Sequence, residues 1–138
     1  MGIRRGMTAI DKILNSAFVD KYSAAMAPSF DFLDTSAGAE IDVPGAPAAV
    51  STAIQKLVTD QGHTVVGASE DQLELAVITK KTMLSWELAT GIEITPTSQG
   101  SHVSVFMQNM PGRPKALLDG KKNKKAAQKL AEQIRTAV

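Results

Sequence analysis

Apolar and polar residues alternate most clearly in the second half of the chain. Over 84–95 the large side chains fall on every second position, with polar or small residues between them. A period of two predicts a strand with one face buried and the other wet or lightly covered. Shorter patterns of this kind predict three more strands, over 63–68, 73–79 and 102–108. Because short turns connect these strands, including one over 96–100, we expect an antiparallel sheet.

Two segments within 39–138 have apolar residues at the three- and four-residue spacing of an amphipathic helix. The first covers 46–61, follows a short strand at 40–43, and has Gly62 at its C-cap position. The second covers 121–136. The predicted order is therefore β-α-β-β-β-β-α, an α+β domain in which both helices pack on one face of a sheet of about five strands.

A third amphipathic helix is predicted near the N-terminus, over 8–26, where Pro28 ends it. We divide the chain into this helix with its linker, 1–38, and a compact domain, 39–138. The outer sheet face of that domain suits either partial exposure or cover by the N-terminal helix. Its predicted residues are Glu74, Ala76, Ile78, Ser85, Glu87, Glu93, Ser104, Phe106 and Gln108.

The apolar stripe of the N-terminal helix has three interpretations. It can pack on its own domain, mediate self-association or bind a protein partner, or lie on a membrane with help from Arg4 and Arg5. The candidate partner-binding residues are Ile10, Leu14, Phe18 and Tyr22.

Composition excludes several classes of protein. The chain has 138 residues, of which 43% are hydrophobic, so a single folded domain with an appendage is expected. It has no cysteine, which excludes disulfides, thiolate metal sites and a cysteine nucleophile. No apolar run approaches the roughly 20 residues that span a bilayer, and charged residues interrupt any secretory signal. We expect a cytoplasmic protein.

Charge is distributed unevenly. Residues 113–138 hold eight of the 15 basic residues and two acids, a net of +6, whereas the rest of the chain has a net of −5. A lysine stripe on the last helix is a candidate anion-binding or acidic-partner face: Lys121, Lys122, Lys125 and Lys129. A solvated helix face is the favoured interpretation, ahead of a nucleic-acid or anionic-membrane contact or an acidic protein partner.

No arrangement of catalytic or metal-binding residues is evident. His63 and His102 stand without a metal-binding spacing, and no serine lies in a nucleophile motif. Glu87 and Glu93 share a strand face but lie about 20 Å apart at the usual rise per residue. An enzyme would need Glu74, Glu87 and His102 to converge. We expect no enzyme activity, cofactor or metal.

The order of elements also resembles known architectures. The opening Ile41-Asp42-Val43-Pro44, followed by Ala48-Ala49-Val50, resembles the start of helix-grip domains, which are START-like. The whole β-α-β4-α order is similar to the TATA-binding-protein-like arrangement, a reduced relative, and to small bacterial domains of unassigned function. The resemblance covers roughly 40–136 and implies a fold without assigning functional residues.

Two functions follow as expectations. The first is a non-enzymatic binding or protein-interaction module whose partner is unknown. The alternative is a small apolar-ligand or lipid carrier of the helix-grip type, because a curved sheet that grips a helix can leave an apolar cavity. The residues expected to line that cavity are Trp86, Leu88, Ile92, Val105, Met107 and Leu130.

Overall fold

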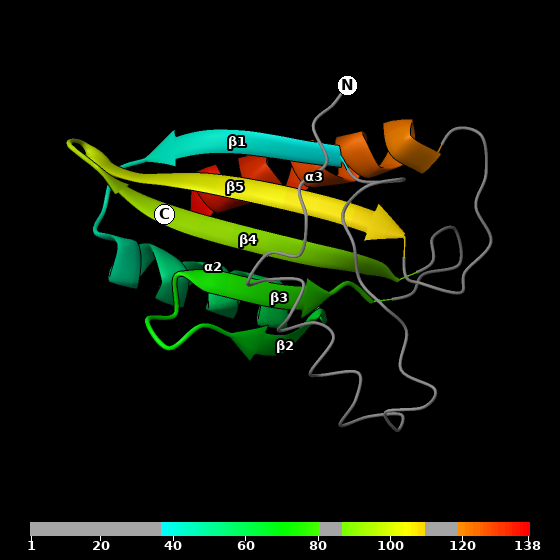
Figure 1. The fold of residues 1–138 in the computed structure, drawn as a ribbon, viewed down its shortest axis with the longest axis horizontal. Coiled ribbons are helices and arrows are strands. Elements are labelled where there is room, and N and C mark those ends of the chain that lie inside the picture. The colour runs from blue at the N-terminus through cyan, green and yellow to red at the C-terminus, as the bar shows by residue number, and fades with distance from the viewer. Residues whose placement is uncertain (1–36, 81–86, 110–118) are drawn as a thin grey trace.

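The computed structural model describes residues 37–80, 87–109 and 119–138. These ranges contain the predicted order of elements: β1 (Ala37–Val43), α2 (Pro47–Asp60), β2 (Thr64–Ala68), β3 (Glu74–Ile78), β4 (Leu88–Thr97), β5 (Gly100–Asn109) and α3 (Asp119–Ala137). The strands form one antiparallel sheet in the order β1-β5-β4-β3-β2. Both helices lie on the same face of the sheet (Figure 1), which confirms the α+β class. The predicted helix at 8–26 lies outside the described residues.

The core fills the layer between the sheet and the two helices. Inward-facing positions on the strands meet the apolar stripes of α2 and α3, as the two periodicities predict. The largest fully buried side chains come from both layers, and they are Ile54, Leu75, Ile92, Ile134, Val50, Val58, Val77, Val103 and Val105. Their burial is the main contribution to stability, at about 1.5–3 kcal/mol for each large apolar side chain.

Strand β1 begins at Ala37 and is longer than the predicted strand at 40–43. Its first residues pair with Met107, Phe106 and Val105 of β5. The sequence pattern did not predict this extension, because Gly38 has no side chain and so interrupts the alternation of apolar and polar residues. The Phe106 ring occupies the space that a side chain would need, since a Cβ on Gly38 would lie 3.3 Å from Phe106 Cδ1.

The turn predicted at 96–100 is also shorter than expected. Pro96 and Thr97 still belong to β4, where they pair with Ser101 and Gly100 of β5. Proline lacks an amide hydrogen, but at the end of a ladder this removes at most one hydrogen bond. The prediction of a strand end at Pro96 was therefore wrong.

Helix α2 is hydrogen-bonded to the turn between β2 and β3, in the half of the sheet that it covers. The Ser51 hydroxyl donates a hydrogen bond to the backbone oxygen of Gln72, and Gln55 Nε2 donates to both Ser51 Oγ and Gln72 Oε1. Gln72 holds a positive φ of 63° in this turn. Within the described ranges, neither helix is long and apolar enough to cross a membrane.

Candidate functional site

A cavity of about 450 Å³ opens between α3 and one end of the sheet. At that end α2 and β5 finish and β4 begins, and the residues that precede β2 and follow β3 complete the lining together with α3. The described residues that line the cavity are Asp60, Gln61, His63, Thr79, Lys80, Leu88, Met107, Ala126, Lys129, Leu130 and Gln133. Volumes of roughly 300–1,000 Å³ are typical of small-molecule sites.

The floor of the cavity is apolar and continuous with the core. Met107 and Leu130 are core residues that are each 3% exposed, and Leu88 and Ala126 pack against the same cluster. Ala126 and Leu130 are four residues apart on α3, so they lie on one side of the helix, one turn apart. A ligand that enters here would meet apolar side chains directly above the core.

The rim owes its shape to the turn between α2 and β2. Gly62 has a φ of +87°, a conformation that side chains disfavour, and the amide of His63 donates to the Val58 carbonyl to close the helix. The Lys80 side chain runs across Gly62, since a Cβ there would lie 3.1 Å from Lys80 Cδ and 3.7 Å from its Nζ. The absence of a side chain at Gly62 therefore lets Lys80 reach the rim.

His63 is held in a defined orientation at the rim. The amide of Lys80 donates to His63 Nδ1 over 3.0 Å, so in the neutral ring the proton lies on Nε2. Burial lowers the pKa of His63, and the nearby positive charge of Lys80 lowers it further. Near neutral pH His63 is thus a neutral side chain, and its donor nitrogen, Nε2, has no hydrogen-bond partner among the described residues.

A buried hydroxyl lies close to the cavity floor. Thr90 shares the inner face of β4 with Leu88 and lies opposite Met107 of β5. Its side chain is fully buried, and its hydroxyl has no hydrogen-bond partner among the described residues. An unmade hydrogen bond of this kind costs about 1–3 kcal/mol, so a polar atom near the cavity floor is under-satisfied.

The structure brings together half of the residues that were predicted to line a cavity. Leu88, Met107 and Leu130 do so, whereas Ile92 and Val105 are fully buried in the core and Trp86 lies outside the described residues. His63 and Lys80, which line the cavity, and Thr90, which is buried beside Leu88 and Met107, were not recognised from the sequence. The sequence did contain a signal for two of them. His63 precedes β2 and Lys80 follows β3, and because these two strands are expected to form an antiparallel hairpin, both residues must lie at its open end.

The outer face of the sheet carries a second polar cluster. His102 Nδ1 lies 2.8 Å from Asp42 Oδ1, and its Nε2 lies 3.1 Å from Glu40 Oε1, which also accepts from Ser104. Hydrogen bonds to Glu40 and then to Asp42 raise the pKa of His102. The carboxylates bind opposite nitrogens of one ring, so they do not converge on a metal, and the described residues contain no metal-binding group.

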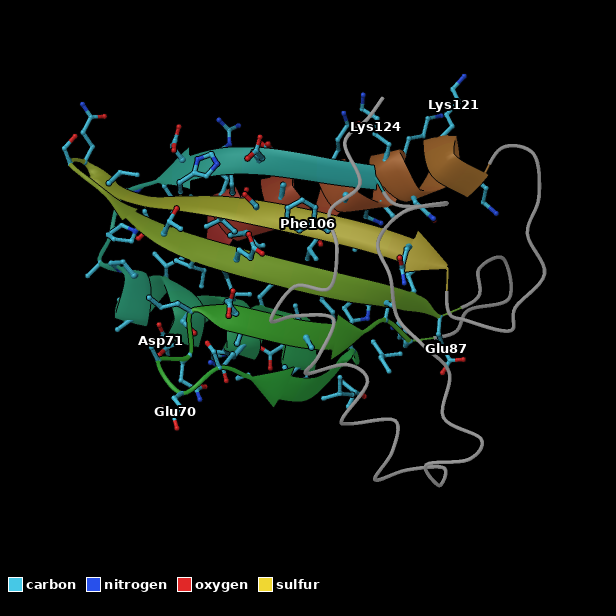
Figure 2. The ribbon with its side chains drawn as sticks, in the orientation of Figure 1. Glu70, Asp71, Glu87, Phe106, Lys121 and Lys124 are labelled. Carbon is cyan, nitrogen blue, oxygen red and sulfur yellow. The ribbon has the colours of Figure 1, made fainter. Side chains whose placement is uncertain are left out.

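The acid–base arrangement considered for an enzyme does not assemble. The partners of His102 are carboxylates of β1, while Glu74 lies opposite Glu93 in the register between β3 and β4. Burial raises the pKa of Glu74, with Glu93 and Asp71 adding to the effect. Glu87 precedes β4 at the opposite end of the strand from Thr95, the partner of His102 (Figure 2).

The predicted lysine stripe is exposed along α3, and Lys121, Lys122 and Lys125 point away from the core. Lys124, which was not assigned to the stripe, is exposed as well (Figure 2). Lys129 differs from the rest because it also lines the cavity. A role for this face in binding stays a prediction, as does the partner-binding face of the N-terminal segment, whose residues are not described.

Comparison with known proteins shows similarity in fold and does not identify a function. No protein-family model matches the sequence, and no curated protein matches it. A crystal structure of a protein from Mesorhizobium loti matches with a TM-score of 0.54 at 13% identity, over 74% of this chain and 95% of that one. One from Chromobacterium violaceum matches with a TM-score of 0.51 at 13% identity, over 76% and 98%. Ara h 8.0201 gives a TM-score of 0.46 at 13% identity, over 73% and 95%.

The element order and strand order are those of the helix-grip arrangement that the sequence resembles. In the described residues it takes a reduced form, with five strands and two helices. Helix α3 is the gripped helix, and it packs chiefly on β1 and β5 while α2 lies beneath the opposite half of the sheet (Figure 1). The cavity lies where α3 passes the open end of this helix-grip sheet.

Proposed function

We propose that this protein binds a small, predominantly apolar molecule in the cavity between α3 and the sheet. One observation carries the proposal: a cavity of about 450 Å³ whose floor is formed by Leu88, Met107 and Leu130. Apolar side chains around an opening of this size, with a few polar groups at its rim, are the usual composition of a ligand site. The helix-grip fold supports this choice, because its sheet and helix enclose a space of this kind.

Ligand binding is favoured over a purely protein-interaction role because its site is built from described residues. The apolar stripe of α3 faces the core and the cavity, and its outward side is lysine-rich and polar. Interaction through the N-terminal segment rests on Ile10, Leu14, Phe18 and Tyr22, which the structure does not describe. It remains a separate prediction that the ligand proposal neither needs nor excludes.

A pair of variants on α3 tests the proposal. Ala126→Leu places a larger side chain inside the cavity, whereas Gln128→Leu places the same side chain on the exposed side of the same helix. In a titration with the neutral fluorescent probe N-phenyl-1-naphthylamine, the full-length wild type should bind one probe saturably. We expect Ala126→Leu to weaken binding roughly tenfold by overfilling the site.

The control Gln128→Leu should bind like the wild type, and circular dichroism should show that both variants keep the fold. Two results would contradict the proposal. One is the absence of saturable binding by the wild type, and the other is an equal effect of the two leucine variants.

A further inference from the structure

The cavity is apolar at its floor and positively charged at its rim. Lys80 and Lys129 both line it, and among the described residues neither ammonium group has a carboxylate partner. Among the described lining residues the one carboxylate, Asp60, is paired with Lys56 over 2.8 Å. The charge presented by the lining is therefore positive, with the negative group already engaged by a lysine outside the cavity.

The positions of these rim groups are set by the fold. Lys80 follows β3 and lies along Gly62, which leaves room for its aliphatic stem. Lys129 precedes Leu130 on α3, and both residues line the cavity. Long lysine side chains commonly cover apolar surface with their stems while the charged ends stay near water.

His63, which also lines the cavity, adds a neutral donor to the two lysines. Its Nδ1 accepts the hydrogen bond from the Lys80 amide, so its Nε2–H remains available to an acceptor in the cavity. Two cations and one N–H donor match an anion with several acceptor oxygens, because hydrogen bonds to an ionised acceptor are the stronger kind.

We propose that the ligand is an anionic amphiphile, such as a fatty carboxylate, whose head group binds Lys80 and Lys129 and whose chain lies on Leu88, Met107 and Leu130. This inference rests on the proposed function, since it assigns the chemistry of a ligand in the same cavity. It predicts that the cavity prefers an anionic ligand to a neutral or cationic one with the same chain, a preference that the apolar floor alone would not produce.

Three probes with the same chain and different heads test the charge preference: decanoate, decan-1-ol and decyltrimethylammonium. Calorimetric titration of the full-length wild type at low salt should rank decanoate first and the cation last. In Lys80→Gln/Lys129→Gln the affinity for decanoate should fall roughly five- to tenfold, while that for decan-1-ol changes less than about twofold. Rising salt should weaken decanoate binding to the wild type because these charges are exposed.

The matched control is Lys124→Gln/Lys125→Gln, which removes the same charge from exposed positions of α3 outside the cavity. It should bind decanoate nearly as the wild type does. If the wild type binds decan-1-ol as tightly as decanoate, or if both double variants lose decanoate equally, the anionic head is refuted while apolar binding stands. If no probe binds, the proposed function itself fails and this inference fails with it.

Discussion

His102 joins strands β1 and β5 through both of its ring nitrogens. Protonated, it donates to Asp42 and Glu40, and these contacts raise its pKa. The same pairing lowers the pKa of Glu40, through the hydrogen bond from His102 and then that from Ser104. A raised histidine pKa adds stability below the unfolded value of about 6.5, and this stability is lost as pH rises through the folded pKa. A lowered carboxyl pKa adds stability above about 4.5, which is lost as pH falls through its folded pKa.

Both contributions are present between about pH 4.5 and 6.5. We therefore expect His102→Gln to reduce the free energy of unfolding more at pH 5.5 than at pH 9.0, by roughly 0.5–1 kcal/mol at the lower pH. Urea titrations at the two pH values measure the difference.

His63 supplies a control of opposite sign. Its pKa is lowered by burial and by Lys80, so the native state disfavours its protonated form. The change in the free energy of unfolding caused by His63→Gln should therefore be more favourable at pH 5.5 than at pH 9.0. A pH-independent effect of His102→Gln would contradict the assigned link between β1 and β5.

The end of the β4–β5 hairpin lies in close backbone contact with the end of β1. Gly100 has a φ of +146°, and a Cβ there would lie 2.3 Å from the Val43 carbonyl oxygen and 2.8 Å from Pro44 Cα. Only glycine therefore allows β1 to end against this hairpin. Gly100→Ala should lower the free energy of unfolding by about 4 kcal/mol, because backbone atoms would have to separate.

Gly45 is the matched comparison for Gly100. It also has a positive φ, of +118°, but a Cβ there would meet only side-chain atoms at 3.4 Å or more. Gly45→Ala should therefore cost about 1–2 kcal/mol, from backbone strain without a clash. Thermal and urea unfolding of both variants measure this difference. Equal costs would show that the close approach to Val43 does not restrict Gly100.

Most elements could be predicted from periodicity, and the errors have local causes. Alternation along β3 correctly places Leu75 and Val77 in the core, and alternation along β4 does the same for Ile92 and Ile94. The pattern failed at Gly38, which extends β1 without an apolar side chain to mark it. It failed again at Pro96, whose pairing with Ser101 depends on the neighbouring strand more than on proline itself.

The cavity could be predicted only in part because it is formed by the ends of elements that are distant in sequence. Periodicity places Leu88, Met107 and Leu130 on the faces that meet. It does not show that the helices fill the space above Ile92 and Val105 and leave it open above Leu88. The rim depends on the turn at Gly62, which places His63 beside Lys80, and such a turn carries no periodic signal.

In the whole molecule, the proposed function requires a ligand site between α3 and the sheet at one end of the domain. The opposite end, where Val43 approaches Gly100 and Val50 approaches Gly45, belongs to the same core but contributes no residue to this cavity. A real ligand should therefore affect the two ends differently, although both contain buried apolar side chains.

The most direct measurement is a methyl-resolved NMR titration of the full-length protein with decan-1-ol. We expect saturable chemical-shift changes at the methyl groups of Leu88, Met107 and Leu130, while those of Val43 and Val50 stay nearly unchanged. Changes of equal size at both ends, or no change at the three cavity residues at saturating ligand, would contradict the central claim.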